Sequence, residues 1–312
     1  MKHYTSINDI DNLSNWIEEA KALKANPLEH IILGKDKTLG LLFFNSSLRT
    51  RLSTQKAALN LGMNPIVMNV SGDAWGLEFE DGTVMNGNTA EHIKEAAAVV
   101  SQYCDIIAVR AFPTLTDKEK DESEQVMKAF MEHASVPIVN MESATGHPLQ
   151  GLTDALTISE HTKKAKPKVV LSWAPHIKPL PHAVANSFVQ AMQKMDVEFV
   201  IANPEGYDLN PKITGDTPIY HNQEEAFKGA DFIYTKNWSS YEAYGKVVSK
   251  DPNWMITKDK IGCAKFMHCL PVRRNVVVED AVLDSDSSIV IEQANNRTYA
   301  AQLVLKKLLE NK

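Results

Sequence analysis

The sequence predicts an α/β protein with two domains, each containing a parallel sheet flanked by helices. Strand-like apolar runs alternate with helix-like stretches along the 312 residues, which is typical of parallel sheets with helices on both faces. The length is about twice that of an average domain. The alternation starts again after a long helix expected over residues 149–164, so we predict a boundary near residue 150, between domains 1–150 and 151–293.

Apolar runs bounded by polar or turn-forming residues locate the elements of the first domain. Its strands are expected at Thr38–Phe44, Pro65–Val70, Cys104–Arg110 and Pro137–Met141. Its helices are expected to comprise a first helix that ends near Lys24, then Arg49–Leu61, Thr89–Tyr103 and Lys118–His133. Residues 71–88 are polar and rich in glycine around Trp75, so we expect a loop there.

The same reasoning locates the elements of the second domain. Its strands are expected at Lys168–Trp173, Glu198–Ala202, Asp231–Thr235, Ala264–His268 and Ser288–Ile291, with helices between them. The last helix, Asn296–Leu309, is amphipathic. We expect the C-terminal segment 294–312 to pack back onto the first domain.

The composition argues against several classes of protein. The net charge is −6, from 33 basic and 39 acidic residues, so no basic excess suggests nucleic acid binding. The three cysteines, Cys104, Cys263 and Cys269, are too few and too far apart for a disulfide framework or a zinc site. We expect no metal and no cofactor. No apolar signal segment or membrane span is evident, so we expect a cytoplasmic protein.

A candidate anion site follows the first strand. Ser47, Arg49, Thr50 and Arg51 lie at or near the start of the helix Arg49–Leu61. Free backbone N–H groups and the helix dipole favour an anion there, and hydroxyl and guanidinium groups suit a phosphate or a carboxylate. The alternative is an ordinary basic first turn of a surface helix.

Further candidates follow other strands, where ligands bind in sheets of this class. Arg110 ends one strand, His147-Pro148-Leu149-Gln150 follows the next, and His268-Cys269-Leu270-Pro271 follows Ala264–Met267. Each has an ordinary interpretation when taken alone: a surface arginine, a turn histidine, and a small buried cysteine.

Together and in this order, these motifs resemble the aspartate and ornithine carbamoyltransferase family, and the resemblance covers essentially the whole chain. It implies a first domain that binds carbamoyl phosphate and a second that binds the amino acid. It implies catalytic roles for Arg110, His147, Gln150 and Cys269. It implies that carbamoyl phosphate contacts Ser47, Leu48, Arg49, Thr50, Trp75, Arg110, His147, Pro148, Leu149, Gln150, Cys269, Leu270 and Arg297.

The implied chemistry is coherent. The phosphate would bind at Ser47, Arg49 and Thr50, and the carbonyl oxygen would face Thr50, Arg110 and His147. An amine attacks the carbonyl carbon, an oxyanion forms, and phosphate leaves. Cationic donors held at both places where negative charge develops are what this transition state requires.

Other segments bear on the amine. The Ser-Met-Gly loop of ornithine carbamoyltransferases is absent, and Gln150 stands where aspartate carbamoyltransferases carry proline. The segments 141–147, 173–176, 234–238 and 269–275 resemble the branch that carbamylates N-acylated ornithine. By that resemblance the acylated amino acid contacts Glu142, His176, Lys236, Arg273 and Ala90. The resemblance also implies a homotrimer in which Trp75 reaches a neighbouring subunit's site.

Two positions favour a succinyl over an acetyl group. Acetyl-specific members carry a glutamate near Ala90, which would repel a succinyl carboxylate, and a lysine near Val277. We therefore expect transfer to the δ-amine of N-succinylornithine, giving N-succinylcitrulline and phosphate, in arginine biosynthesis. N-acetylornithine, then ornithine, are the alternatives, and a non-catalytic subunit is a third. The proline-rich segment 175–182 is a rigid loop or, by resemblance, part of a knotted second domain.

Overall fold

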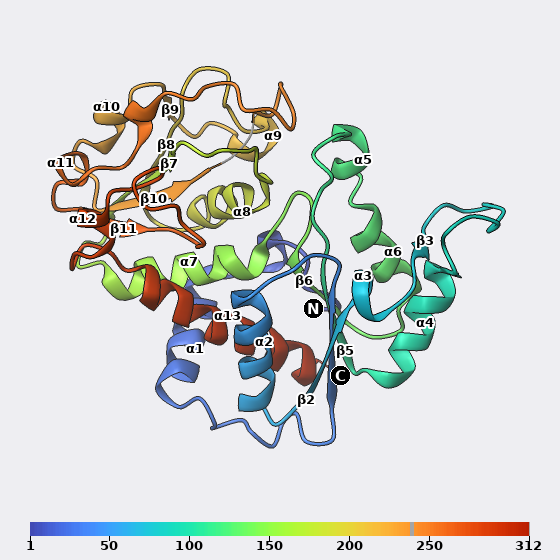
Figure 1. Cartoon of the computed structure of the whole chain (residues 1–312). Helices are drawn as coiled ribbons and strands as arrows, with labels where there is room; N and C mark the ends of the chain where they lie inside the picture. The colour runs from blue at the N-terminus through green and yellow to red at the C-terminus, as the bar shows by residue number, and fades with distance from the viewer. Residues whose placement is uncertain (238–239, 312) are drawn as a thin grey trace. The chain divides into compact units, whose positions relative to one another are not determined.

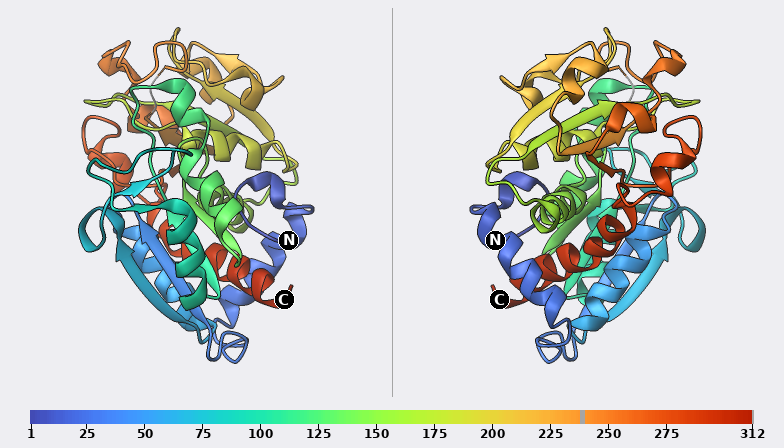
Figure 2. Two further views of the ribbon diagram at one scale, coloured as in Figure 1. Left: turned by 90° about the vertical axis from the view of Figure 1, so that its right-hand side faces the viewer. Right: turned by 90° about the vertical axis from the view of Figure 1, so that its left-hand side faces the viewer.

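The computed structural model describes residues 1–237 and 240–311, and it confirms the predicted fold class (Figure 1). The chain forms two compact units. Unit 1 contains residues 1–114, residues 119–149 and the described residues from Arg297 onward, and unit 2 contains residues 115–118 and 150–296. Both ends of the described chain therefore lie in unit 1 (Figure 2).

The sheet of unit 1 has four parallel strands in the order β2-β1-β5-β6. These strands are β1 (Thr38–Phe43), β2 (Asn64–Asn69), β5 (Ile106–Arg110) and β6 (Ile138–Glu142). The helices wholly within unit 1 are η1 (Ile7–Asp9), α1 (Leu13–Ala25), α2 (Arg49–Asn60), α3 (Val70–Asp73), α4 (Ile93–Tyr103) and α6 (Gln125–His133). Three helices contain residues of both units: α5 (Lys118–Glu122), α7 (Pro148–His161) and α13 (Val290–Glu310).

Helices cover both faces of this sheet because the chain reverses direction across it. It passes from β1 through α2 to the edge strand β2, and then returns through α4 to β5. With right-handed crossovers, α2 and α4 must lie on opposite faces. Figure 1 shows α4 and α6 on one side of the sheet, with α1 and α2 on the other.

The core of unit 1 fills both faces of the sheet. On the α4 and α6 side, apolar strand residues pack with Ile93, Ala97 and Phe130. Elsewhere in unit 1, Gln302 of α13 accepts a hydrogen bond from Asn60 of α2 at 2.8 Å. Lys307 of α13 pairs with Glu19 of α1 at 2.7 Å. The described residues of α13 from Arg297 onward are thereby held to the first helices of the chain.

Unit 2 contains a second parallel sheet, with five strands in the order β11-β10-β7-β8-β9. The strands are β7 (Lys168–Trp173), β8 (Glu198–Ala202), β9 (Ile219–Tyr220), β10 (Phe232–Lys236) and β11 (Lys265–Met267). Its helices are α8 (Ala183–Met192), α9 (Pro211–Thr214), α10 (Gln223–Phe227), η2 (Pro252–Trp254), α11 (Lys258–Ile261) and α12 (Asp280–Leu283). The predicted threading of the 175–182 loop stays a prediction.

Two expected elements were wrong. Ser288–Ile291 is not a strand, because Ser288 forms one isolated bridge with Phe266 and α13 begins at Val290. A short apolar run does not distinguish a strand from the start of a buried helix. The helix expected over Lys118–His133 is two helices, because Glu124 has a left-handed backbone, φ 55°, which an α-helix does not allow.

The expected loop and helix before α4 also differ. Residues 71–88 include part of α3, and β3 (Leu77–Glu78) pairs in parallel with β4 (Glu91–His92). The helix expected from Thr89 therefore begins only at Ile93. We call residues 74–92 the arm of unit 1.

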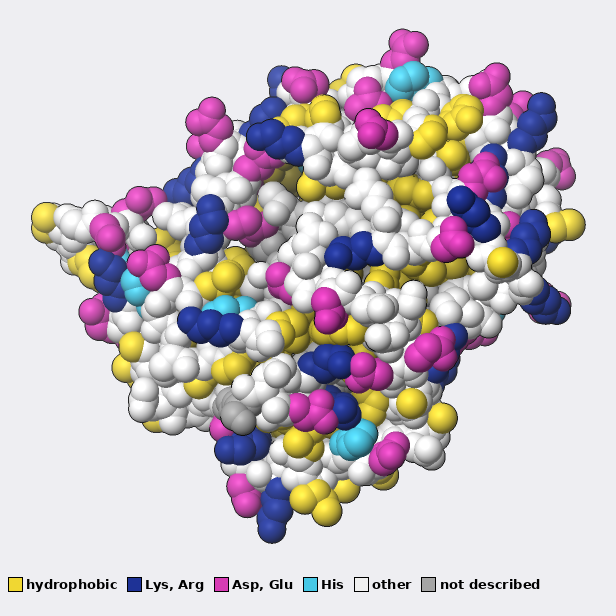
Figure 3. Space-filling model, turned by 180° about the vertical axis from the view of Figure 1, so that it is seen from behind, with side chains coloured by type: hydrophobic (Ala, Val, Ile, Leu, Met, Phe, Trp, Pro, Cys, Tyr) yellow, Lys and Arg dark blue, Asp and Glu magenta, His cyan; other side chains and the backbone are white. Residues whose placement is uncertain are grey.

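The surface is mixed in character. The face drawn in Figure 3 carries basic and acidic side chains interspersed with apolar ones. Within the described ranges, none of the helices is both long enough and apolar enough to cross a membrane.

Candidate active site

The candidate residues of unit 1 gather at the carboxyl ends of its central strands. In the register of the sheet, Phe43 at the end of β1 is opposite Arg110 at the end of β5, and Arg110 is opposite Glu142 at the end of β6. The chain leaves β1 and β5 toward helices on opposite faces, which makes this edge a topological switch point. Ligands of open α/β sheets bind in the crevice at such points.

A β-bulge brings Arg110 and Glu142 together. Val109 pairs with Asn140, but Arg110 pairs with Glu142, so β6 contains one extra residue at this step. Bulges redirect side chains near functional sites. Arg110 Nη1 lies 2.9 Å from Glu142 Oε2, and both side chains are buried. The carboxylate offsets the cost of burying this guanidinium.

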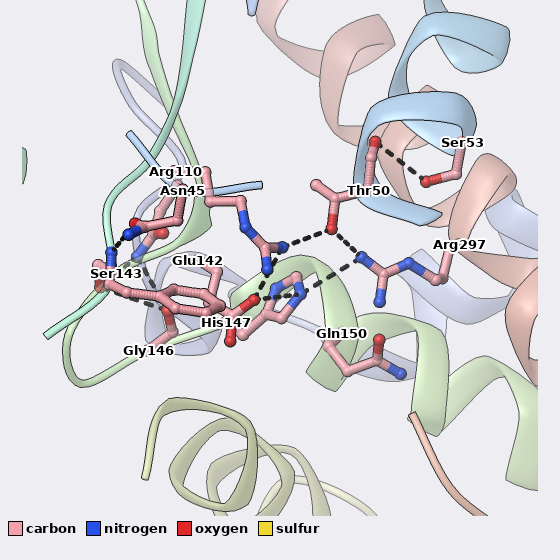
Figure 4. Close-up of polar contacts among 12 residues, drawn as sticks. Asn45, Thr50, Ser53, Arg110, Glu142, Ser143, Gly146, His147, Gln150 and Arg297 are labelled. Atoms are coloured by element: carbon pink, nitrogen blue, oxygen red, sulfur yellow. Dashed lines mark hydrogen bonds and ion pairs between the residues drawn. The ribbon is translucent and has the colours of Figure 1, made fainter. Parts of the chain in front are cut away.

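Thr50 joins two guanidinium groups. It lies in the first turn of α2 and is buried. Its Oγ1 accepts hydrogen bonds from Arg110 Nη1 at 2.9 Å and from Arg297 Nη2 at 2.5 Å. Figure 4 shows both guanidinium groups turned toward this hydroxyl. A hydroxyl has two lone pairs and one proton, so the Thr50 proton is left as a donor directed elsewhere.

His147 completes the cluster as a hydrogen-bond acceptor. Its Nε2 lies 3.3 Å from Arg297 Nη2, and a guanidinium can only donate. The ring in this arrangement is therefore neutral, with its proton on Nδ1. Glu142 Oε2 is 3.6 Å from the same nitrogen, which is outside hydrogen-bond range. Five residues from β5, β6, α2, α13 and the loop before α7 thus meet: Thr50, Arg110, Glu142, His147 and Arg297.

The start of α2 is suited to an anion. Its N-cap residue, Leu48, provides no side-chain hydrogen bond. The first N–H groups of the helix are therefore not capped by that side chain and can donate to another acceptor. Ser47 precedes this cap and Arg49 begins the helix. Arg51 serves the fold instead, because its Nη2 donates to Asn69 at 2.6 Å and its guanidinium lies over Phe43.

Sequence reasoning missed Glu124, which holds the loop between Glu142 and His147. Its Oε1 accepts from Ser143 Oγ and from the backbone N–H of Thr145, both at 2.7 Å. The loop is thereby tied to the turn before α6. No local pattern in the sequence could identify this role, because 21 residues separate Glu124 from Thr145.

In unit 2, Gln150 and the segment after β11 belong to one buried hydrogen-bond network. Gln150 Nε2 donates to Asp154 at 2.6 Å, and Gln293 Nε2 donates to the same carboxylate oxygen at 2.7 Å. Gln293 in turn accepts from the backbone N–H of His268 at 3.0 Å. Asp154 was also missed, although its i+4 spacing from Gln150 on a helix was available as a signal.

The backbone after β11 has a defined shape. The N–H of Leu270 donates to His268 Nδ1 at 2.8 Å, and Leu270 has φ 57°, a left-handed conformation that is uncommon for leucine. Cys269, between them, is half-buried. Burial, with Asp154 and Cys269 nearby, raises the pKa of the Tyr234 hydroxyl well above its ordinary value.

The candidate amino-acid ligands lie at the carboxyl edge of the unit 2 sheet. Lys236 ends β10 and is buried, and His176 follows β7, its neighbour in the sheet. Arg273 Nε lies 3.3 Å from His176 Nε2. Because Arg273 can only donate, His176 carries its proton on Nδ1 and donates it to the Lys178 carbonyl at 2.8 Å.

The arm of unit 1 brings Trp75 and Ala90 close together. Trp75 Nε1 donates to Glu91 at 2.7 Å, and the N–H of Ala90 donates to the carbonyl of Gly76 at 2.9 Å. Both Trp75 and Ala90 are exposed. In the described part of the chain, no group of three or more His, Cys, Asp and Glu side chains could hold a metal ion.

The histidine arrangement in unit 2 makes a pH prediction. Burial lowers the pKa of His176 below its ordinary value, the bond to the Lys178 carbonyl opposes this, and the Arg273 charge adds to the lowering. Arg273→Ala should therefore raise the pKa of His176 while leaving it below the ordinary value, because burial remains. NMR titration, with the ring signal assigned through His176→Gln, measures this.

Arg274→Ala is the matched control for this titration. The Arg274 side chain is bound to Asp280 and Asp284 at 2.7–2.9 Å. Its removal in Arg274→Ala should therefore leave the pKa of His176 unchanged. Equal shifts in the two variants would show that the Arg273 contact does not control this histidine.

Two family models match successive parts of the chain. The model for the aspartate/ornithine carbamoyltransferase carbamoyl-P binding domain matches residues 2–160, and the model for the family's Asp/Orn binding domain matches residues 181–308. The N-succinylornithine carbamoyltransferase of Bacteroides fragilis (strain 638R) is 50% identical over 316 residues, covering 100% of this chain and 99% of the relative. The N-acetylornithine carbamoyltransferase of Xanthomonas axonopodis pv. citri (strain 306) is 36% identical over 335 residues, covering 99% and 96%.

Solved structures give the same result. A glutamate-to-alanine variant of N-acetyl-L-ornithine transcarbamylase, crystallised with carbamyl phosphate and N-succinyl-L-norvaline, superposes with a TM-score of 0.92. It is 36% identical, and the match covers 99% of this chain and 100% of that one. The chain therefore belongs to the aspartate/ornithine carbamoyltransferase family.

Proposed function

We propose that this protein transfers the carbamoyl group of carbamoyl phosphate to the δ-amine of N-succinylornithine, giving N-succinylcitrulline and phosphate, in arginine biosynthesis. The observation that carries the proposal is the buried convergence of Arg110 and Arg297 on the Thr50 hydroxyl at a sheet switch point. The 50% identity to relatives named for this substrate supports the choice of amine.

The phosphate group is assigned to the start of α2. Ser47, Arg49 and Thr50 supply hydroxyl and guanidinium groups there, and the helix N–H groups lack a side-chain cap. Arg297 adds a second cation through its contact with Thr50. Charge-assisted hydrogen bonds of this kind are about twice as strong as neutral ones. Leu48 contributes through its backbone position at the cap.

The carbonyl oxygen of the carbamoyl group is assigned to Thr50, Arg110 and His147. Both arginines donate to the Thr50 oxygen, so the single hydrogen of this hydroxyl remains to donate to the carbonyl oxygen. Arg110 Nε is buried and has no hydrogen bond to any described residue, so an oxygen ligand would relieve its desolvation. As the amine attacks, Thr50 and Arg110 stabilise the oxyanion as donors, and His147, whose Nε2 accepts from Arg297, would contribute through the proton on its Nδ1. The cations at α2 stabilise the departing phosphate.

The carbamoyl NH2 group is assigned to acceptors. Gln150 Oε1 and the backbone carbonyls at Cys269 and Leu270 would receive its two hydrogens. Pro148 and Leu149 start α7 and place Gln150 within the first turn of this helix. Positioning of both reactants in this way converts a bimolecular encounter into an oriented reaction.

The acylornithine is assigned to groups of unit 2 and to Glu142. The buried Lys236 ammonium, His176 and Arg273 suit the carboxylate and amide of an acylated amino acid. Glu142 is paired with Arg110 in the structure. Its contact with the amino acid would therefore come from a carboxylate that also neutralises Arg110.

The succinyl group is favoured by the arm of unit 1. Ala90 offers no charge, and the neighbouring carboxylate of Glu91 is already bound to Trp75. Val277 is buried and apolar. A glutamate-to-alanine variant of the acetylornithine enzyme was crystallised with a succinyl ligand, which agrees with the loss of a repelling carboxylate.

We also propose a cytoplasmic homotrimer that binds neither nucleic acid nor membrane and shares its sites between subunits. Leu48, Leu52 and Leu59 are exposed at or near α2 with helical spacing, which would suit contact with a second copy. Trp75 would reach a neighbouring site from the exposed arm.

Thr50→Val should lower kcat/KM for carbamoyl phosphate on the order of 100-fold, because it keeps the shape of the side chain but removes the oxygen that two arginines share. Steady-state kinetics with varied carbamoyl phosphate measure the effect.

Thr54→Val is the matched control for Thr50→Val. Thr54 lies one turn later on α2, is equally buried, and its hydroxyl has no hydrogen bond to a described residue. It should retain nearly full activity. Equal losses in both variants would assign the defect to packing of α2 and contradict the role of the Thr50 hydroxyl.

Ureido-product formation from carbamoyl phosphate should be fastest with N-succinylornithine when it is assayed beside N-acetylornithine and ornithine. Preference for the acetyl compound would reassign the amine but keep the reaction. Absence of product from all three amines, with carbamoyl phosphate still bound, would contradict the proposed amine class.

Ala90→Glu should reduce the ratio of kcat/KM for the succinyl over the acetyl compound by at least about tenfold, the factor that a 1.4 kcal/mol repulsion produces. In Ala90→Gln, the new side chain has nearly the same size as glutamate but no charge, so this variant should change the ratio much less. Equal effects of the two variants would mean that volume, and not charge, at position 90 selects the acyl group.

A further inference from the structure

A buried carboxylate is hydrogen-bonded, directly or through one side chain, to two groups that the proposed reaction uses: Gln150 and the segment after β11. Asp154 is in α7, and its side chain has no exposed surface. Its Oδ1 accepts the amide of Gln150 at 2.6 Å and the amide of Gln293, from α13, at 2.7 Å. All three side chains belong to unit 2 and are 0–1% exposed.

The position of Asp154 is costly for the fold. A carboxylate transferred from water into a protein interior loses several kcal/mol of hydration, which hydrogen bonds offset only in part. An apolar side chain of similar volume at such a site is often as stable or more stable. A role beyond stability would account for an aspartate here.

The carboxylate determines which way the Gln150 amide faces. An amide side chain has a donating end and an accepting end, and an ionised carboxylate only accepts. Asp154 therefore binds the NH2 end of Gln150, so Oε1 is the end of the amide that faces away from this carboxylate. Gln150 can accept a hydrogen from the carbamoyl NH2 group only in this orientation.

The same carboxylate acts on the segment after β11 through Gln293. Because Asp154 holds the NH2 end of Gln293, the Oε1 of Gln293 faces the backbone N–H of His268, at 3.0 Å. His268 then accepts from the N–H of Leu270 at 2.8 Å. These bonds hold the peptide groups 267–268 and 269–270, and the second of these contains the carbonyl of Cys269.

We propose that Asp154 is a positioning residue that turns the acceptors for the carbamoyl NH2 group toward the ligand: Gln150 directly, and the carbonyl of Cys269 through Gln293. The inference rests on the proposed function, since it takes the role of Gln150 from it. Asp154 itself does not contact the substrate. The orientation of oxygen atoms, not the negative charge, is what it provides.

Kinetic comparison of Asp154→Asn with Asp154→Ala tests this role. Asparagine can keep an oxygen at the place of Oδ1 for both amides, so Asp154→Asn should stay within a few fold of the wild type. Alanine removes the acceptor, and a misplaced binding group of this kind costs on the order of 100-fold in kcat/KM for carbamoyl phosphate. Equal and near-wild-type activity of both variants would overturn the proposal.

A double-mutant cycle with Gln150→Ala separates positioning from packing. If Asp154 acts largely through Gln150, Asp154→Ala should cost far less in the Gln150→Ala background than in the wild type. Fully additive losses would show that Asp154 acts independently of Gln150 and would overturn that part of the proposal.

Hydrogen exchange gives a readout that does not depend on turnover. Asp154→Ala should speed amide exchange in a peptide covering residues 264–274, while a peptide covering α8 keeps the wild-type rate. Unchanged exchange in residues 264–274 would overturn the part of the proposal in which Asp154 acts through Gln293. If wild-type protein made no ureido product, the proposed function would fail while this exchange result still decided the orientation network.

Gln293→Met provides a second variant should Asp154→Ala fail to fold. It removes the amide that links Asp154 to the backbone of His268, so exchange in residues 264–274 should rise, while Asp154 still accepts from Gln150. Unchanged exchange in this variant would also contradict the proposal.

Discussion

The structure of unit 1 depends on the burial of two guanidinium groups against one hydroxyl. Arg110 and Arg297 come from distant parts of the chain and both donate to Thr50. Burying a cation is unfavourable unless acceptors and counter-charges surround it. Glu142 supplies a counter-charge to Arg110, and the sheet register with its bulge places that carboxylate. The cluster therefore carries excess donor capacity, which suits an anionic ligand whose charge changes during reaction.

Groups that can only donate or only accept give the ambiguous side chains of this protein a defined orientation. Arginines set the ring tautomers of His147 and His176, because a guanidinium can only donate. The Asp154 carboxylate sets the direction of the Gln150 amide, because a carboxylate can only accept. Histidines and amides present either a donor or an acceptor according to their neighbours. Surrounding charges thereby determine which atoms face a ligand.

The two units hold different kinds of polar group. Unit 1 holds a cationic cluster at the switch point of its sheet and an exposed arm that carries Ala90. Unit 2 holds the acceptor network around Asp154 and the basic residues at the ends of β7 and β10. The buried cationic cluster and the buried acceptor network are thus built on separate sheets, and α7 contains residues of both units.

The sequence alone determined the α/β class, the strands of both sheets except β9, and the residues that end those strands, although it also predicted a strand at Ser288–Ile291 that does not form. These follow from local apolar runs, because hydrophobic periodicity and turn residues act over a few positions. Only the tertiary structure decided which side chains meet. The Thr50–Arg297 contact spans 247 residues and the Asp154–Gln293 contact spans 139. Such contacts arise from packing of whole elements, and no local preference of the chain encodes them.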